Sequence, residues 1–426
     1  MDANRFLTHS LQDPRVTRIL AAALDAVEPG RIVRDYLNNA DLPEHGRTFL
    51  LGIGKAAEPM TFAAADVLTP FTDALVITKH ASFPLRERIT VMEGGHPIPD
   101  ERSLAAGQAV LDFVSKLNEN DLLICLVSGG GSALVTAPRM KIPLEEIRQL
   151  TSSLLESGAT IDEINTVRRR LDYLKGGELA RKTKAKIVSL ILSDVIGDHL
   201  EVIASGPTAP DPTSFIDAVY ILRKYNLEKT ASPQILGALL LQPSIINDAI
   251  FFTRVQNIII GNNQAAADAA KVQAEQEGFY SEIIGLEIQG EARRIGKKLA
   301  ETLFAASDNQ PSPFCLIAGG ETTVTIKGNG KGGRNQEVAL AAVDELRGIE
   351  NILFISLATD GDDGPTNAAG AVVNGESYQR AKKLGMDASD YLSRNDAYNF
   401  FNPLDDLLKP GYTGTNVNDL MFLIGF

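Results

Sequence analysis

Short apolar runs rich in β-branched residues recur along the chain. Each run is followed by a turn that bears glycine or aspartate, and then by a longer amphipathic stretch. This alternation is typical of βαβ units, in which parallel strands are joined by helices. The predicted strands are 49–53, 74–78, 122–127, 187–192, 255–260, 314–318 and 352–358. The pattern therefore indicates an α/β protein with two domains, an N-terminal one with a mostly parallel sheet and flanking helices and a second α/β one.

Two of the amphipathic stretches, residues 143–156 and 262–277, predict helices that cover the sheets. Gly158 and Gly278 follow their ends, where glycine commonly stops a helix.

Residues 164–181 predict a further helix with an unusually basic sequence. We expect some of its basic side chains to be solvated and one or two to face a ligand. The candidates are Arg168, Arg169, Arg170 and Lys175.

The chain has 426 residues, which is too long for one ordinary hydrophobic core and favours two domains. A change of composition over residues 228–250 is the best candidate for the connection between them, and a surface excursion is the alternative. The carboxyl ends of parallel strands line the ligand crevice of open α/β sheets. We therefore expect the loops 52–57, 128–133 and 359–364 to converge.

Composition excludes several classes of function. The 41 basic and 54 acidic residues give a formal net charge of -13, which disfavours a general nucleic-acid or membrane-surface partner. No segment offers the roughly 18 uncharged apolar residues that a membrane-spanning helix needs. The two cysteines, Cys125 and Cys315, lie within apolar runs. We expect both to be buried packing residues of a protein in the reducing cytoplasm.

The segment SGGGS, from Ser128 to Ser132, directly follows the apolar run LLICLV. Glycines at this point let successive backbone N–H groups face inward, which makes a concave site for a phosphate. The segment has neither the ending of a P-loop nor the spacing of a dinucleotide fold. A tight turn between strand and helix is the alternative interpretation.

Lys55 stands in GIGKAA at the expected beginning of a helix, where its charge adds unfavourably to the helix dipole. A phosphate or carboxylate between this ammonium group and the N-terminal amides would account for the position. A solvated lysine is the alternative.

Arg334 lies in GKGGRNQE, thirteen residues after the GGE segment that contains Glu321. The glycines leave room for a ligand beside the backbone, and a guanidinium group can bind a carboxylate or phosphate through two N–H groups. The alternative is a surface ion pair between Arg334 and Glu337, worth about 0.5 kcal/mol.

TDGDDG, residues 359–364, places three aspartates at the end of an apolar run. Asp360 is a candidate ligand of Mg²⁺, or the base that accepts a substrate hydroxyl proton. A structural turn is the alternative. Asp194 lies in a long loop, 193–214, which also follows a predicted strand and contains aspartates. His96 and His199 lack metal-binding spacing, and we interpret both as structural.

The chain resembles the glycerate 2-kinase family over essentially its whole length. The resemblance rests on the joint order of LGIGKAA, GGHPIPDERS, LVSGGGSAL, INTVRRRLDYLKGGELA, LSDVIGDHLEVIASGPTAPDPT, GNNQAAADAA, AGGETTV, GKGGRNQEVALA, ATDGDDGPTNAAGA and YTGTNVNDL. Two short segments depart from the family's pattern: RRLD at 169–172 and KPGY at 409–412.

The resemblance implies a Rossmann-like N-terminal domain, 1–240, and an α/β C-terminal domain called MOFRL, 241–426, with the active site in the cleft between them. It also implies transfer of the γ-phosphoryl group of ATP to the 2-hydroxyl of D-glycerate with Mg²⁺, giving 2-phosphoglycerate and ADP. Which hydroxy acid is preferred is left open, and so is the oligomeric state, with a homodimer as one option.

From the motifs and the resemblance together we predict a set of site residues. The catalytic residues are Lys55, Arg334, Asp360 and Glu321; the nucleotide-binding residues are Ser128, Gly129, Gly130, Gly131, Ser132 and Asn263; the substrate-binding residues are Lys55, Arg334 and Asn416; and the Mg²⁺ ligands are Asp194 and Asp360.

Two other functions stay open on the sequence. An NAD(P)H-dependent hydroxypyruvate reductase should have a GxGxxG turn with an acidic residue about 20 residues further on. A non-catalytic protein that binds a sugar acid would use the same residues without turning over ATP.

Overall fold

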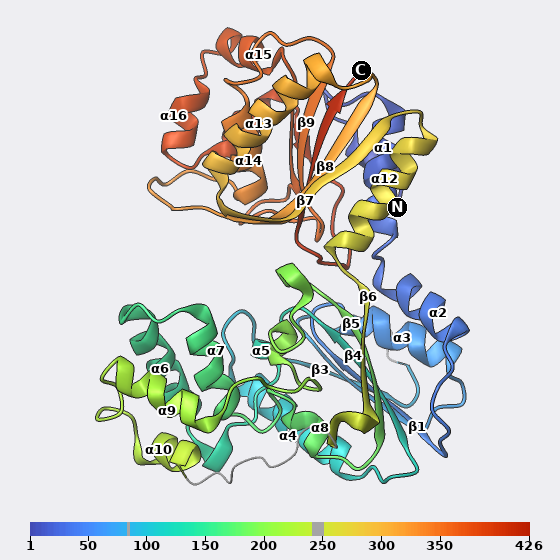
Figure 1. Cartoon of the computed structure of the whole chain (residues 1–426), viewed down its shortest axis with the longest axis vertical. Helices are drawn as coiled ribbons and strands as arrows, with labels where there is room; N and C mark the ends of the chain where they lie inside the picture. The colour runs from blue at the N-terminus through green and yellow to red at the C-terminus, as the bar shows by residue number, and fades with distance from the viewer. Residues whose placement is uncertain (83–85, 241–250) are drawn as a thin grey trace. The chain divides into compact units, whose positions relative to one another are not determined.

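The computed structural model describes residues 1–82, 86–240 and 251–426. The chain forms two compact units (Figure 1). We call Pro29–Ser193 with Asp198–Ile260 the N-unit, and Met1–Glu28 with Asp194–Gly197 and Gly261–Phe426 the C-unit. The predicted division of the domains at residues 240 and 241 stays a prediction, and residues 241–250 of the predicted connection lie outside the described residues.

The N-unit contains a six-stranded sheet in the order β3-β2-β1-β4-β5-β6. Its strands are β1 (Thr48–Ile53), β2 (Asp73–Thr78), β3 (Ile89–Glu93), β4 (Leu122–Ser128), β5 (Lys186–Leu192) and β6 (Val255–Gly261). The pairs from β3 to β5 are all parallel. The chain builds one side of the sheet from β1 to β3 and then returns to place β4 on the other side of β1. Ligands bind at such a switch in strand order in open α/β sheets.

Helices cover the N-unit sheet. They are α2 (Pro29–Asn39), α3 (Ala57–Val67), α4 (Glu101–Ser115), α5 (Gly131–Leu134), α6 (Leu144–Glu156), α7 (Ile161–Arg170), α8 (Glu178–Arg181), α9 (Phe215–Lys224) and α10 (Pro233–Leu240), with the 3-10 turns η2 (Arg139–Lys141), η4 (Ile203–Ser205) and η5 (Phe252–Arg254). The predicted helix 143–156 is confirmed as α6. Its stop is confirmed too, since Gly158 adopts a φ of 78°.

The prediction of one continuous helix over 164–181 is wrong. Helix α7 ends at Arg170, and α8 is a separate turn that begins at Glu178. Between them Gly176 and Gly177 take φ values of 60° and 79°, which do not occur within a right-handed helix.

The C-unit contains a mixed six-stranded sheet in the order β11-β10-β9-β12-β8-β7. Its strands are β7 (Tyr280–Glu291), β8 (Phe314–Thr323), β9 (Ile352–Ala358), β10 (Gly370–Val373), β11 (Leu407–Leu408) and β12 (Asp419–Gly425). The last strand, β12, lies between β8 and β9 and runs antiparallel to both. Its first residue, Asp419, is therefore opposite Gly320 and Ala358, near the carboxyl ends of the neighbouring strands. All seven predicted strands are present, five in the N-unit and two in the C-unit.

The remaining helices belong to the C-unit. They are α1 (Pro14–Asp25), α12 (Asn263–Gln276), α13 (Ala292–Asn309), α14 (Arg334–Ala342), α15 (Ser377–Lys383), α16 (Ala388–Ser393) and α17 (Ala397–Phe401), with the 3-10 turns η1 (Ala3–Phe6) and η6 (Asn402–Leu404); η3 (Ile196–Asp198) spans the border of the two units. Helix α12 confirms the prediction for 262–277, and α1 packs beside it (Figure 1). No helix in the described part of the chain combines the length and apolar character that crossing a membrane would require.

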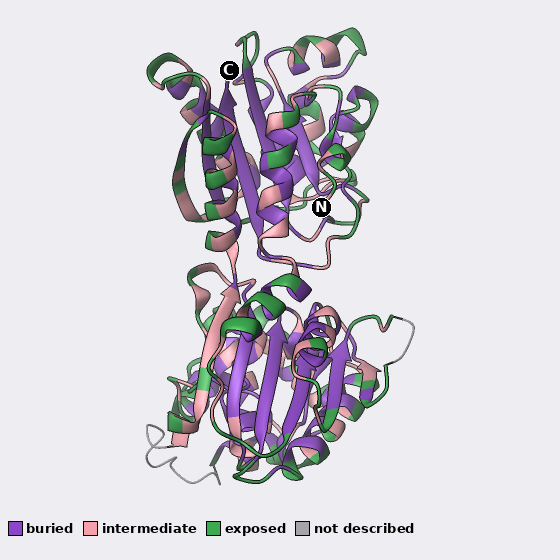
Figure 2. Cartoon of the chain, turned by 90° about the vertical axis from the view of Figure 1, so that its right-hand side faces the viewer, coloured by how far each residue is buried: buried purple, intermediate pink, exposed green. Residues whose placement is uncertain are grey.

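Each unit has a core of its own, formed by the strands and the inner faces of the helices (Figure 2). Both cysteines belong to these cores. Cys125 in β4 and Cys315 in β8 are free thiols with at most 1% exposure, and burial raises the pKa of each to about 12. They are packing residues, as the sequence predicts.

The N-terminal segment is attached to the rest of the C-unit through Asp406, whose carboxylate has no exposed surface. It accepts hydrogen bonds from the backbone N–H and the hydroxyl of Ser10 at 2.8 and 3.0 Å, and from Arg380 at 2.7 Å. Burial raises the pKa of Asp406, and Arg380 opposes that rise.

Asp406→Ala should destabilise the C-unit by about 3 kcal/mol, because it leaves a largely buried guanidinium group without its counter-charge. Asp390→Ala is the control: its pair with Arg394 is exposed, and its loss should cost less than about 0.5 kcal/mol. Denaturant unfolding measures both changes, and limited proteolysis should cleave Asp406→Ala near Ser10 first. Equal unfolding curves for the two variants would contradict this attachment.

Candidate functional site

The N-unit brings together two motifs predicted to bind anions. Lys55 follows β1 and SGGGS begins at the last residue of β4, and these two strands are neighbours in the sheet. The N–H of Lys55 donates to the carbonyl of Gly129 at 2.9 Å, and the N–H of Ala56 donates to the hydroxyl of Ser128 at 3.0 Å. The predicted convergence of loops 52–57 and 128–133 is therefore confirmed. Loop 359–364 belongs to the C-unit.

The glycine loop leaves backbone donors available. Gly130 has a φ of 85°, which explains why glycine stands there. Within residues 1–82, 86–240 and 251–426, the N–H groups of Gly130, Gly131 and Ser132 have no hydrogen-bond acceptor. Lys55 is partly buried beside them, and its Cγ would lie 3.1 Å from a Cβ built on Gly130. A phosphate-sized anion would satisfy these donors.

The long loop 193–214 forms another side of this site. The hydroxyls of Ser132 and Ser205 are 2.7 Å apart. A Cβ on Gly131 would come within 2.7 Å of the Cβ of Ala204, so the two loops are in close contact.

His96, predicted from the sequence to be structural, also lies at this site. Its imidazole would come within 3.2 Å of a Cβ on Gly130. The two glycines directly before it in GGHPIPD indicate a loop that packs closely against another backbone, and this signal could have identified His96.

In the C-unit, Arg334 is held by carboxylates. Its Nε and Nη2 donate to the two oxygens of Asp419 at 2.6 and 3.0 Å, and its Nη1 donates to Glu321 at 2.8 Å. Asp419 has no exposed surface, whereas the Arg334 and Glu321 side chains are 31% and 45% exposed. Burial raises the pKa of Asp419, and Arg334 opposes that rise. Burial tends to lower the pKa of Arg334, but the charge of Asp419 outweighs this effect and raises the pKa of Arg334 above its usual value.

Asp419 is a site residue that the sequence reasoning missed. A carboxylate that begins the apolar run DLMFLIG has no packing role there. This signal could have identified it.

Asp363 determines where the helix of Arg334 begins. Its carboxylate accepts from the N–H groups of Asn335 and Gln336 at 3.1 and 2.8 Å, in the first turn of α14. A Cβ on Gly333 would lie 2.3 Å from the Asp363 Cγ, so this glycine is needed to admit a protein side chain. The interpretation that the glycines around Arg334 make room for a ligand is therefore wrong for Gly333.

The alternative ion pair between Arg334 and Glu337 is not formed. Glu337 is 2% exposed and instead accepts from Arg293 at 2.7 Å and from Asn395 at 3.0 Å.

Asp360 follows β9 and is partly buried; its Oδ1 accepts from the N–H of Asp362 at 3.2 Å. Asn416 accepts from the N–H of Asn418 at 3.1 Å, in the loop just before Asp419. Asp194 is counted with the same unit as Asp360. In the described part of the chain no three His, Cys, Asp or Glu side chains are grouped as a metal site. The assignment of Asp194 and Asp360 to a metal stays a prediction.

Asn263 has a structural use. It is the first residue of α12, and its Nδ2 donates to the carbonyls of Val417 and Asp419 at 2.8 and 3.0 Å. The side chain thereby holds the start of β12 in place. Its assignment to the nucleotide stays a prediction.

The basic segment 168–175 is more buried than predicted. Arg169 and Arg170 both pair with Asp211 at 2.9 Å, and Lys175 pairs with Asp172 at 2.6 Å. These three cations are at most 5% exposed, so the expectation that such side chains are solvated is wrong for them. The two arginines stabilise the loop that contains Asp211.

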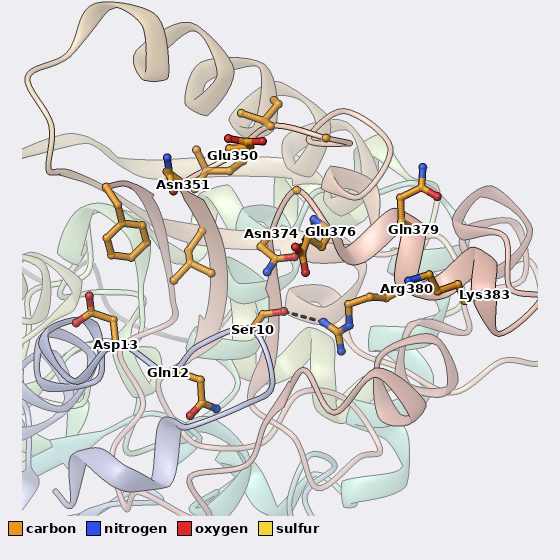
Figure 3. Close-up of a pocket in the computed structure, with 16 residues that line it drawn as sticks. Ser10, Gln12, Asp13, Glu350, Asn351, Asn374, Glu376, Gln379, Arg380 and Lys383 are labelled. Carbon is orange, nitrogen blue, oxygen red and sulfur yellow. Dashed lines mark hydrogen bonds between the residues drawn. The ribbon is translucent and has the colours of Figure 1, made fainter.

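A cavity of about 860 Å³ lies in the C-unit, at the end of the sheet where β9 begins and β12 ends (Figure 3). None of the predicted site residues lines it. Its Arg380 is already committed to Ser10 and Asp406. The cavity is therefore separate from the candidate site.

Comparison with known proteins now decides the family. Residues 15–240 match the family described as Domain of unknown function (DUF4147), and residues 314–419 match the MOFRL family. The sequence is 43% identical to D-glycerate 2-kinase from Thermotoga maritima, over 95% of this chain and 96% of that protein. The chain belongs to the glycerate 2-kinase family. A crystal structure of glycerate kinase from Thermotoga maritima has a TM-score of 0.89 to this chain. The match covers 96% of this chain and 98% of the chain in that structure.

Other relatives show how the family is named. Glycerate 2-kinase from Pyrococcus horikoshii is 38% identical, over 96% of each chain. A relative from Agrobacterium vitis is 37% identical over 96% of this chain and 93% of its own, and it has a provisional hydroxypyruvate reductase name.

The pH dependence of stability should report on Asp363. Burial raises its pKa to about 7, although the amides of Gln336 and Asn335 oppose that rise. The folded state then binds this proton more tightly than the unfolded state does. Its contribution to stability is complete below pH 4 and is lost as pH rises to about 7, at roughly 1 kcal/mol per pH unit.

Unfolding midpoints of this glycerate 2-kinase family member and of Asp363→Asn, compared from pH 4 to pH 8, should therefore differ in slope, because asparagine does not titrate. Asp362→Asn, which changes the exposed neighbour, is the control and should follow the unsubstituted protein. Parallel curves for all three proteins would show that Asp363 does not titrate in this range.

Proposed function

We propose that this protein is a kinase that transfers the γ-phosphoryl group of ATP to the 2-hydroxyl of D-glycerate, giving 2-phosphoglycerate and ADP. The observation that supports this best is the set of free loop amides beside Lys55, which suits a phosphate. The names of the relatives from Thermotoga maritima and Pyrococcus horikoshii support the same reaction.

In this proposal the N-unit holds the nucleotide phosphates. The N–H groups of Gly130, Gly131 and Ser132 bind phosphate oxygens, and the ammonium group of Lys55 offsets their negative charge. Among the described residues Lys55 has no ion-pair partner, so no carboxylate has to be displaced when an anion binds.

Arg334 supplies the second positive charge. Asp419 and Glu321 use three of its five N–H groups, so one N–H on each of Nη1 and Nη2 stays available. These two groups can bind two oxygens of the glycerate carboxylate or of the transferring phosphoryl group. Because Asp419 fixes the guanidinium plane, little conformational freedom is lost when the ligand binds.

Asp360 and Asp194 would hold Mg²⁺, which offsets charge on the phosphates when it is bound; this ion commonly uses only one or two carboxylates with substrate oxygens, so the residues present fit it. Glu321 or Asp360 orients the glycerate hydroxyl and accepts its proton. Glu321 is exposed enough to reach a substrate, and its carboxylate lies 2.8 Å from Arg334. Asn416 would contact the substrate from the neighbouring loop.

A coupled assay separates the three functions. The kinase releases ADP only when D-glycerate is present, the reductase oxidises NAD(P)H with hydroxypyruvate, and a binding protein gives neither signal. The provisional name of the Agrobacterium vitis relative makes the second measurement necessary. The location in the cytoplasm and the homodimer stay predictions.

Lys55→Ala and Arg334→Ala should each lower kcat by about 10²-fold or more, because each removes a charge that stabilises the transferring phosphoryl group. Arg334→Lys should recover little activity, since lysine keeps the charge but not the two-pronged geometry.

The controls are Lys116→Ala, which changes an exposed lysine of the N-unit, and Arg31→Ala, which changes an arginine that is 60% exposed. Both should keep the activity of the unsubstituted protein. Circular dichroism must show that every variant is folded. Full activity in folded Lys55→Ala or Arg334→Ala would refute that residue's role.

Asp419→Asn tests whether the orientation of Arg334 matters. The variant keeps the shape of the side chain but removes the charge that fixes the guanidinium group. We expect kcat to fall at least about tenfold while the KM for ATP changes little. Asp405→Asn is the control, because Asp405 is exposed and asparagine tolerates its φ of 55°. A lower melting temperature with unchanged kcat would mean that Asp419 has only a structural role.

A further inference from the structure

The loop between β3 and α4 is held against the glycine loop of the N-unit. The N–H of Gly94 donates to the carbonyl of Thr78 at 3.0 Å, and a Cβ on Gly94 would lie 2.1 Å from the carbonyl oxygen of Leu134 in α5. The next N–H, of Gly95, donates to the hydroxyl of Ser103 at 2.9 Å. Close packing on both sides therefore determines where the following residue, His96, is placed.

The imidazole of His96 lies over Gly130. Its Cδ2 and Nε2 would be 3.1 and 3.2 Å from a Cβ on this glycine, and the Cγ of Lys55 would be equally close. The side chain is only partly buried, and neither ring nitrogen has a hydrogen-bond partner among the residues that the structure describes. A ring held this firmly beside free amide donors, with its own nitrogens unused, is placed to contact a ligand.

The charges that face His96 favour an anion. Burial, and then Lys55 and Lys79, lower the pKa of His96 to about 4, so the ring is neutral near pH 7 and one nitrogen is a donor. The nearest acids of its own loop, Glu93 and Asp100, are both paired with Arg102, at 3.4 and 2.8 Å. The site thus combines cations and neutral donors.

We propose that His96 is a further ligand-binding residue of this site, whose imidazole donates a hydrogen bond to the oxyanion that Lys55 and the loop amides also bind. The oxyanion is a phosphate of the nucleotide or the carboxylate of glycerate. Its identity rests on the proposed function, whereas its binding can be tested without catalysis.

Two substitutions separate hydrogen bonding from packing. His96→Phe keeps a planar ring and removes the donor, and it should lower kcat/KM by about ten- to a hundredfold for the ligand that His96 contacts. His96→Gln keeps a neutral donor and should recover most of that loss. His199→Gln is the control, since His199 is 64% exposed, and it should have no effect. A rise in the KM for ATP identifies the phosphate, and a rise in the KM for D-glycerate identifies the carboxylate.

Binding to the full-length protein provides the second test. Nuclear magnetic resonance follows the His96 C2–H signal, assigned by its absence in His96→Gln, during titration with ADP, inorganic phosphate or D-glycerate. A bound oxyanion opposes Lys55 and Lys79, so the titration midpoint of His96 should rise by about one pH unit or more. The signal of His199 should keep its midpoint.

Unchanged kcat/KM for both substrates in His96→Phe, together with an unmoved His96 midpoint, would overturn the proposal. So would equal losses in His96→Phe and His96→Gln, since only packing would then matter. If the protein releases no ADP with D-glycerate but the midpoint still rises with ADP or phosphate, the proposed function fails and the inference about His96 stands.

Discussion

A carboxylate with no exposed surface has to be neutralised, and Asp419 imposes this requirement on the whole C-unit site. Its position opposite Gly320 and Ala358 follows from the antiparallel pairing of β12 with β8 and β9. Arg334 provides the neutralising charge through two hydrogen bonds, so its backbone has to begin α14 beside the sheet. The burial of one charge thus determines which way the guanidinium group faces and which of its N–H groups a ligand can reach.

Asp363 provides hydrogen-bond acceptors for backbone N–H groups that would otherwise be unpaired. The first N–H groups of α14 have no partners within the helix, and the Asp363 carboxylate accepts from two of them. A glycine at position 333 is the consequence, because any side chain there would collide with Asp363. Gly333 of GKGGRNQE and Asp363 of TDGDDG, two separate motifs in the sequence, are therefore in direct contact in the structure.

All seven predicted strands were continuous apolar runs and are present, because strands buried on both faces have such sequences. The similar run of β12 was not predicted. The predicted convergence of Lys55 and SGGGS is confirmed, because the two segments follow adjacent parallel strands and topology brings them together. The failures arise where distant residues supply the reason. Helix α7 already ends at Arg170, whereas the two left-handed glycines, Gly176 and Gly177, lie directly before α8. The burial of Arg169 depends on Asp211, 42 residues away, and no local pattern reports that pair.

The two units differ in how their positive charges are balanced, and this difference bears on the reaction. Lys55 and the neutral His96 lie beside unused amide donors in the N-unit, which suits a polyanion that brings its own negative charge. Arg334 lies among the carboxylates of Asp419 and Glu321, with Asp360 in the same unit. A site that contains both a cation and carboxylates suits a ligand with a single negative charge, and its carboxylate oxygens can also bind a metal cation. In a chain with a net charge of -13, a polyanion is favoured at the first arrangement over the second, and this charge pattern supports the proposal that the N-unit holds the nucleotide phosphates.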